Sequence, residues 1–329
     1  MDFLSLLLQA PSNNGWRLIV FVMVKLTKEK LKQCIAVLDE VDKYRTLTEE
    51  EKKMVVKSIL STKYLDLRCD WAFKYVMQNL DILKMLLNDF LPEKIESIET
   101  LPNEIARLSA DDKNIIMDVI CKTDDGRRFI VEMQRKKKDS FLSRMLYYGA
   151  SMLSNQLNPN KDYDTLMPVY VICFMDFKLK HQTDQLVYRF AMREMDSGEL
   201  YNKLISVYLC ELPRLKVESI KGLNPVESWF YILENLSNFA GKPEEIGERY
   251  APIAQAASTL RLPDVEQLKY IRAMVSEHEK LDIGKAYYKD GIQEGIAIVA
   301  KAMLEDSVSI EKISLYTGLS LQDIQALKA

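Results

Sequence analysis

The chain has 329 residues, of which 48% are hydrophobic and 28% are charged, and its formal net charge is −3. This length accommodates one large domain with appendages or two domains, and the composition is ordinary for a globular protein. The small net charge excludes binding of a polyanion through the field of the whole molecule, so such a partner would need a local basic patch. The five cysteines and two histidines make a Cys/His zinc site or a histidine-activated nucleophile a poor prediction.

The cysteines are odd in number and widely spaced, and most lie in apolar runs. This pattern is typical of buried thiols in a reducing compartment and predicts a cytoplasmic location.

Two short apolar runs, residues 3–8 and 18–24, lie near the start of the sequence. The first lacks a preceding Lys or Arg, which a signal peptide needs, and the second is too short to span a bilayer. We therefore expect no membrane partner. Residues 1–22 either have a structural role or precede a start of translation at Met23.

Residues 27–60 have the pattern of a helical hairpin. Thr27 is placed to cap the first helix, and Thr48 with Glu51 forms a capping box for the second. After this hairpin the pattern changes to alternating helices and strands. Helices are expected at 70–80, 82–91 and 140–157, and strands at 95–101, on both sides of a tight turn within 114–138, at 166–177, 186–193 and 204–212.

This order predicts an α/β fold, with a mixed sheet packed between helices. The rest of the chain is expected to be helical, and Gly318 and Ser320 supply a C-cap and a fresh N-cap in the tail. We expect an N-terminal extension, a core, a helical region and a helical tail, at 1–61, 62–215, 216–282 and 283–329.

The hairpin within 114–138 carries the residues of greatest chemical interest. A two-residue turn would place Asp118 opposite Met133 and send Glu132 to the other face of the sheet. A three-residue loop with Gly126 in the left-handed conformation instead places Asp118 opposite Glu132. The Asp-Asp-Gly sequence of the loop favours the second geometry.

Two carboxylates and a carbonyl oxygen at such fixed spacing are hard donors that suit Mg²⁺ or Mn²⁺. Gln134 can add an oxygen ligand or orient a water, but it cannot supply positive charge. The alternative is an exposed polar strand face that binds nothing. Four cations follow the second strand directly and are candidates for contacts to a phosphate backbone: Arg135, Lys136, Lys137 and Lys138.

The core resembles the PD-(D/E)-x-K nuclease superfamily, and within it the branch of recombination-promoting nucleases or transposases. The resemblance covers residues 62–215 well and the C-terminal tail loosely. It is carried by D-x-x-F-K at Asp70, Phe73 and Lys74, by I-M-D-V around Asp118, by V-E-M-Q at 131–134, by R-x-x-Y-Y at Arg144, Tyr147 and Tyr148, and by the apolar strand at 169–174.

The resemblance implies that Asp118 and Glu132 bind the metal and that Gln134 stands where most of the superfamily has a lysine. Asp70 is either an additional acid or a helix cap paired with Lys74.

The helix that follows the hairpin adds two further candidates. Arg144 either contacts a phosphate or pairs with a carboxylate, and Tyr148 either stacks near the site or packs on the sheet.

The function expected from these features is Mg²⁺- or Mn²⁺-dependent hydrolysis of DNA, in recombination or in the processing of mobile elements. One alternative is a relative without activity that binds DNA or protein, and another is a hydrolase of RNA or of other phosphate esters. The helix pair within 310–327 has few cations in its second helix. We therefore expect it to pack or to form a homodimer rather than to read DNA.

Overall fold

A computed structural model describes residues 27–105, 115–138, 140–157, 162–180 and 183–327. These residues form two compact units, of which one ends at Met274 and the other begins at Val275. The question of a start at Met23 concerns residues outside the described ranges. Within these ranges, no helix has both the length and the apolar character that a membrane span requires.

The N-terminal part of the first unit is helical, as predicted. Its helices are α2 (Lys28–Asp39), α3 (Asp42–Arg45) and α4 (Glu49–Ser61). The Thr27 hydroxyl accepts a hydrogen bond from the backbone N–H of Lys30. Thr48 and Glu51 cap each other's backbone N–H groups and complete the predicted capping box.

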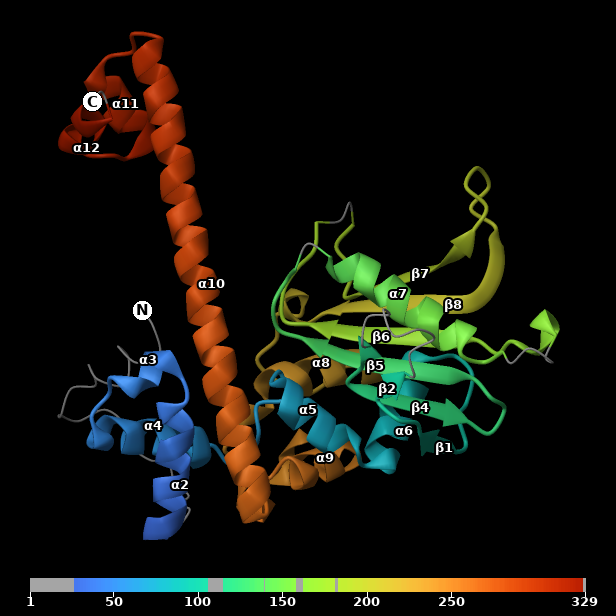
Figure 1. Cartoon of the computed structure of the whole chain (residues 1–329). Helices are drawn as coiled ribbons and strands as arrows, with labels where there is room; N and C mark the ends of the chain where they lie inside the picture. Colours follow the sequence, from blue (N-terminus) through green and yellow to red (C-terminus); the bar gives the residue numbers. More distant parts are fainter. Residues whose placement is uncertain (1–26, 106–114, 139, 158–161, 181–182, 328–329) are drawn as a thin grey trace. The chain divides into compact units, whose positions relative to one another are not determined.

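A mixed sheet forms the centre of this unit (Figure 1), with the strands in the order β1-β4-β5-β6-β8-β7. Strands β5, β6 and β8 are parallel neighbours, whereas β1 pairs with β4, β4 with β5, and β7 with β8 in antiparallel fashion. The bounds are β1 (Ile98–Thr100), β4 (Val119–Thr123), β5 (Arg128–Gln134), β6 (Val169–Met175), β7 (Val187–Arg193) and β8 (Leu200–Glu211).

The α/β architecture is therefore confirmed. A short ladder of β2 (Glu104–Ile105) with β3 (Ile115–Ile116) was not predicted, because two residues are too few to show a periodic pattern.

Helices cover both faces of the sheet. All seven residues of β6 are buried, as expected for a strand covered on both sides. Cys173 lies in the core beneath α7 (Phe141–Ser154). The next residue, Phe174, faces the opposite side and meets Phe73, Phe90 and Phe230. These three come from α5 (Asp70–Met77), α6 (Leu80–Phe90) and α8 (Pro225–Asn235).

Two details at α5 correct the sequence-based expectation. The N-cap residue is Cys69, and Asp70 is the first residue of the helix. The helix also ends earlier than predicted, because the side chain of Asn79 caps a new helix that starts at Leu80. The apolar periodicity continues across this break, so it could not mark the boundary.

The remaining helices lead from the sheet into the second unit. They are α9 (Ala251–Ala256), α10 (Asp264–Glu305), α11 (Ile310–Thr317) and α12 (Leu321–Ala326). Gly318 ends α11 in the left-handed conformation and Ser320 caps α12, as predicted. Ala300, Ile313 and Ile324 form the small core of this end. Short 3-10 helices cover Tyr163–Thr165, Leu212–Arg214, Leu236–Asn238, Pro243–Ile246, Glu248–Tyr250 and Thr259–Arg261.

Candidate active site

The turn between β4 and β5 sets which residues of the two strands lie opposite each other. The backbone N–H groups of Thr123 and Gly126 donate to the carbonyls of Arg127 and Thr123, each over 3.0 Å. Gly126 has a φ of +89°, which glycine adopts more readily than other residues. Val119 is paired with Val131, so the same register places Asp118 opposite Glu132. The predicted three-residue loop is confirmed.

Asp118 and Glu132 contact each other where the ladder between β4 and β5 stops. The N–H of Asp118 donates to Oε1 of Glu132 over 2.9 Å. The N–H of Met133 donates to Oδ2 of Asp118 over 2.8 Å. The two carboxylates thus replace the missing ladder bonds, and this fixes their positions. They are only 6% and 2% exposed.

A second chain of contacts connects Glu132 to α7. Gln134 Nε2 donates to Oε2 of Glu132 over 3.1 Å, and the guanidinium of Arg144 donates to Oε1 of Gln134. The same guanidinium lies 5.9 Å from the centre of the Tyr148 ring. The buried Nε–H of Arg144 has no partner among the described residues. An oxygen of a bound anion or a water can satisfy it.

The helix α7 can lie this close to the sheet because it carries a glycine there. A Cβ on Gly149 would come within 3.0 Å of Ile205 and 3.3 Å of Val171. Close packing of the helix then sets the positions of Arg144 and Tyr148 over the edge of the site.

From α5, on the other side, Lys74 reaches the acids. Its Nζ lies 2.9 Å from Oδ1 of Asp118 and 3.0 Å from Oδ2 of Asp70. The predicted pairing of Asp70 with Lys74 is therefore confirmed, although Asp70 does not cap the helix. Asp70 is exposed, and it meets the buried acids both through Lys74 and through a hydrogen bond between its side chain and that of Asp118.

Burial and mutual repulsion disturb the titration of the acids. Burial, followed by the charges of Glu132 and Asp70, raises the pKa of Asp118 well above its ordinary value. Burial also raises the pKa of Glu132 to about 7, although the Asp118 N–H, Arg144 and Lys74 act in the opposite direction. Burial alone would lower the pKa of Lys74, but Asp118 and Asp70 raise it overall. Lys74 therefore stays charged.

These raised pKa values identify a place where added positive charge is stabilising. Asp118 and Glu132 are hard oxygen donors of the kind that Mg²⁺ and Mn²⁺ prefer, and Mg²⁺ commonly takes one or two carboxylates and fills its other positions with water or phosphate oxygens. In the part of the chain that the structure describes, no three acidic, histidine or cysteine side chains gather as a ready metal site. The two carboxylates therefore fit a cation whose other coordination positions are filled by water and substrate.

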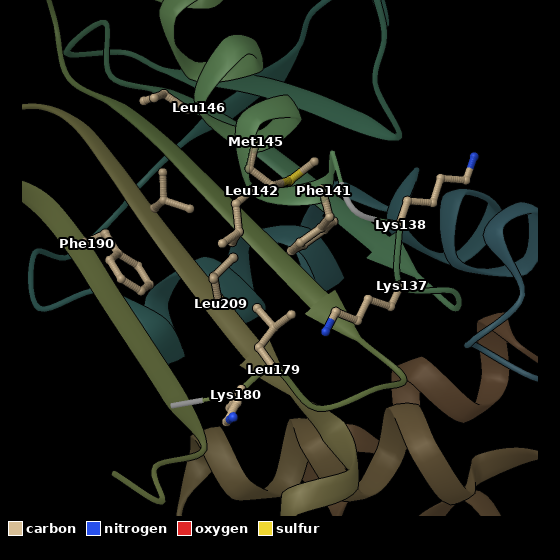
Figure 2. A pocket seen from close by; sticks show the side chains of 11 residues that line it. Lys137, Lys138, Phe141, Leu142, Met145, Leu146, Leu179, Lys180, Phe190 and Leu209 are labelled. Carbon is tan, nitrogen blue, oxygen red and sulfur yellow. The ribbon is translucent and has the colours of Figure 1, made fainter. Parts of the chain in front are cut away.

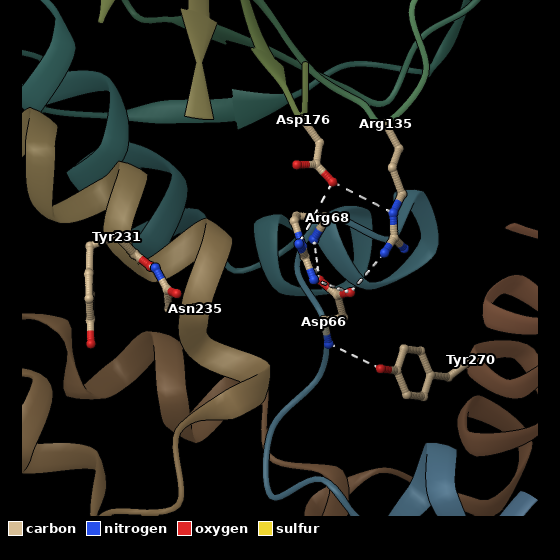
Figure 3. A network of polar contacts seen from close by, with 7 residues as sticks. All are labelled: Asp66, Arg68, Arg135, Asp176, Tyr231, Asn235 and Tyr270. Atoms are coloured by element: carbon tan, nitrogen blue, oxygen red, sulfur yellow. Dashed lines mark hydrogen bonds and ion pairs between the residues drawn. The ribbon is translucent and has the colours of Figure 1, made fainter. Parts of the chain in front are cut away.

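The four cations after β5 differ in their surroundings. Arg135 lies in a network with Asp66, Arg68 and Asp176 (Figure 3). It is 3.4 Å from Asp66 and 3.8 Å from Asp176, and its side chain is 15% exposed. Burial opposes ionisation of Asp66, but Arg68 and Arg135 lower its pKa overall. This network ties the end of β5 to the segment that precedes α5.

Lys137 and Lys138 are exposed, and they border a largely apolar pocket of about 540 Å³ (Figure 2). In this view Lys138 extends away from the apolar side chains. The pocket lies between α7 and strands β7 and β8, with Leu142, Phe190 and Leu209 in its lining. Lys136 is half-buried and has a partner.

Two residues of the site were not identified from the sequence. Lys74 was recognised only as part of a motif and as a partner of Asp70, and its contact with Asp118 depends on how α5 packs. Asn103 donates from Nδ2 to the carbonyl of Asp118 over 2.9 Å. It accepts from the N–H of Met117 over 3.0 Å, so it holds the backbone that carries the acid. No sequence pattern indicates this role.

A mixed sheet covered on both faces, with paired acids at the end of a central hairpin, defines a restriction-endonuclease-like α/β core. The chain belongs to the PD-(D/E)XK nuclease family transposases, whose family model matches residues 67–290. This confirms the resemblance drawn from the motifs. Among curated proteins and among solved structures, no match to the chain was found.

Proposed function

We propose that the chain hydrolyses phosphodiester bonds of DNA with the help of Mg²⁺ or Mn²⁺. The observation that carries the proposal is the pair of buried carboxylates, Asp118 and Glu132, fixed against each other by backbone hydrogen bonds. Burial of two neighbouring carboxylates is unfavourable for their charged forms, and such groups with raised pKa values cluster at functional sites. Membership of a nuclease family makes nuclease chemistry the best explanation for retaining them.

Asp118 and Glu132 would hold the metal through their carboxylate oxygens. When bound, the metal would polarise the scissile phosphate and lower the pKa of the attacking water. In the reaction, the water oxygen forms a bond to phosphorus while the P–O bond to one sugar breaks. The proton lost by the water passes to solvent, and the leaving oxygen takes a proton from solvent.

The protein's own residues would orient the substrate around this centre. Gln134 restrains Glu132, and Arg144 restrains Gln134, so the acid that binds the metal cannot turn away. The unsatisfied Nε–H of Arg144 can meet a non-bridging phosphate oxygen. Tyr148, whose ring centre lies 5.9 Å from the Arg144 guanidinium, would stack on or hydrogen-bond to the substrate.

The exposed pair Lys137 and Lys138 is the best candidate for contacts to the neighbouring phosphates of the strand. Lys136 is a weaker candidate because it is half-buried and already has a partner. Arg135 supports the fold through its network, and we assign it no direct phosphate contact.

A second candidate is a relative that binds DNA or protein without cutting. The contacts of the site favour it, since Gln134 is neutral and Lys74 already pairs with Oδ1 of Asp118. In both cases we propose a cytoplasmic protein that acts in recombination or mobile-element processing. Self-association through the C-terminal helices remains part of this proposal, and sedimentation at several protein concentrations would test it.

Supercoiled plasmid incubated with the purified chain and Mg²⁺ or Mn²⁺ tests the proposal. We expect the wild type to nick or linearise it, and Asp118→Asn and Glu132→Gln to leave it intact. Asp81→Asn, an exposed acid of α6 that lies outside the site, is the matched control and should cut normally. Binding to DNA without cutting in either metal would favour the second candidate.

A further inference from the structure

In phosphodiester hydrolysis, negative charge builds up on the phosphate oxygens in the transition state. Positive charge beyond that of the metal therefore stabilises this state. Gln134 carries no charge, and both ends of its amide are engaged with Glu132 and Arg144. It is therefore poorly suited to supply this charge. A source of positive charge lies instead on α5.

Lys74 is the lysine that contacts the acid pair. Its ammonium bridges Asp118 and Asp70 over 2.9 Å and 3.0 Å. An ammonium has three N–H donors, so these two contacts leave one for a further oxygen. The side chain is 28% exposed, which allows that donor to reach a molecule bound over the acids.

The position of Lys74 is also well supported. The preceding residue, Phe73, is fully buried and packs against Phe174 of the central strand. Ahead of the helix, Asp66 is held by Arg68 and Arg135 (Figure 3). Both contacts fix α5 against the sheet, so Lys74 is held in place for its role before substrate binds.

We propose that Lys74 is a catalytic residue that donates a hydrogen bond to the scissile phosphate and supplies the positive charge that Gln134 lacks. This inference rests on the proposed nuclease function. It assigns no proton transfer to Lys74, which stays an ammonium throughout. The competing explanation is that Lys74 only substitutes for the metal in the metal-free chain and moves aside when the cation binds.

The two explanations predict different effects on kcat for Lys74→Met, which keeps the length of the side chain and removes its charge. If Lys74 is catalytic, kcat falls by about 10²- to 10³-fold, as when one charge-stabilising donor is removed, while Mn²⁺ binding stays as tight or becomes tighter. If Lys74 only replaces the metal, Mn²⁺ binds more tightly and kcat is unchanged or higher.

A second variant separates loss of charge from loss of structure. Lys74→Met combined with Gln134→Lys places a lysine on the strand beside Glu132. We expect the kcat of this double variant to be at least tenfold higher than that of Lys74→Met. Lys74→Arg should keep more activity than Lys74→Met. Lys84→Met, on the neighbouring helix α6, is the matched control and should behave as wild type.

The experiment measures plasmid cleavage at saturating Mn²⁺, Mn²⁺ affinity by calorimetry, and thermal unfolding of every variant. A folded Lys74→Met that cuts as fast as wild type overturns the inference and leaves the nuclease proposal standing. If Lys74→Met and the double variant are both folded and the double variant is no more active than Lys74→Met, this result also counts against the inference. A wild type that does not cut in either metal, with Asp118→Asn no different, overturns both.

Discussion

The backbone N–H of Asp118 donates to Oε1 of Glu132 over 2.9 Å at the point where the ladder between their strands ends. The carboxylate of Asp118 in turn accepts a hydrogen bond from the backbone N–H of Met133. Each of the two acids therefore holds the end of the hairpin as well as serving the proposed chemistry. The register that brings them together is set by the turn at Gly126.

Replacing Gly126 with alanine should lower the free energy of unfolding by about 1–3 kcal/mol. The residue has a φ of +89°, and an added Cβ would meet Cγ of Met167 at 3.0 Å. Gly222→Ala is the matched control, because it has a φ of +83° and open space around it. Urea unfolding should show a smaller loss for the control. Equal losses would mean that the contact with Met167 contributes nothing.

Mn²⁺ should raise the melting temperature of the wild type, because a ligand that binds only the folded state at about 100 times its Kd adds about 2.7 kcal/mol. Asp118→Asn and Glu132→Gln should lose most of this shift. EDTA should reverse it. Thermal scans with and without the metal provide the measurement, and an undiminished shift in both variants would place the metal elsewhere.

The double variant Lys137→Ala/Lys138→Ala should bind duplex DNA more weakly and should reduce the slope of log K against log salt by about 2. The reason is that, for each lysine removed, binding releases about one counterion fewer from the DNA. Fluorescence anisotropy over a salt series measures this. Lys32→Ala/Lys57→Ala removes two exposed lysines of the N-terminal helices and should leave the slope unchanged. Equal slopes for both double variants would contradict the assignment.

Arg135→Ala should act on stability instead. Its removal leaves the buried carboxylate of Asp66 paired with Arg68, so we expect a loss of about 3 kcal/mol. Arg272→Ala breaks an exposed ion pair with Glu40 and should lose less than about 1 kcal/mol. Denaturant unfolding compares the two. A loss no larger for Arg135 than for Arg272 would show that the network is not needed for stability.

Asp125 should make the stability of the turn depend on pH. Hydrogen bonds from Arg127, and then Thr123, lower its pKa from the ordinary 3.8 to about 2. A lowered pKa means that the contribution is present above 3.8 and is lost as the pH falls through 2. Because the side chain is 49% exposed, screening reduces the contribution to about 1 kcal/mol.

Unfolding of Asp125→Asn and the wild type should therefore differ at pH 7 and converge in acid. The exposed neighbour Asp124→Asn serves as the control. A difference that stays constant as the pH falls would rule out this linkage.

The sequence by itself determined the features that depend on neighbours along the chain. The Asp-Asp-Gly turn set the register of Asp118 and Glu132, the capping residues placed α2, α4 and α12, and the apolar run of β6 required cover on both faces. These signals are local, since turn and cap chemistry act over a few residues.

Only the tertiary structure decided which partner each charge would meet. The packing of Phe73 on Phe174 brings Lys74 to Asp118, and the meeting of β5 with the segment before α5 turns Arg135 from a candidate phosphate contact into a partner of Asp66. A charged side chain is compatible with many partners, and its energy depends on burial and on groups distant in the sequence. For that reason the acids could be predicted from the sequence, whereas the contact of Lys74 with Asp118 could not.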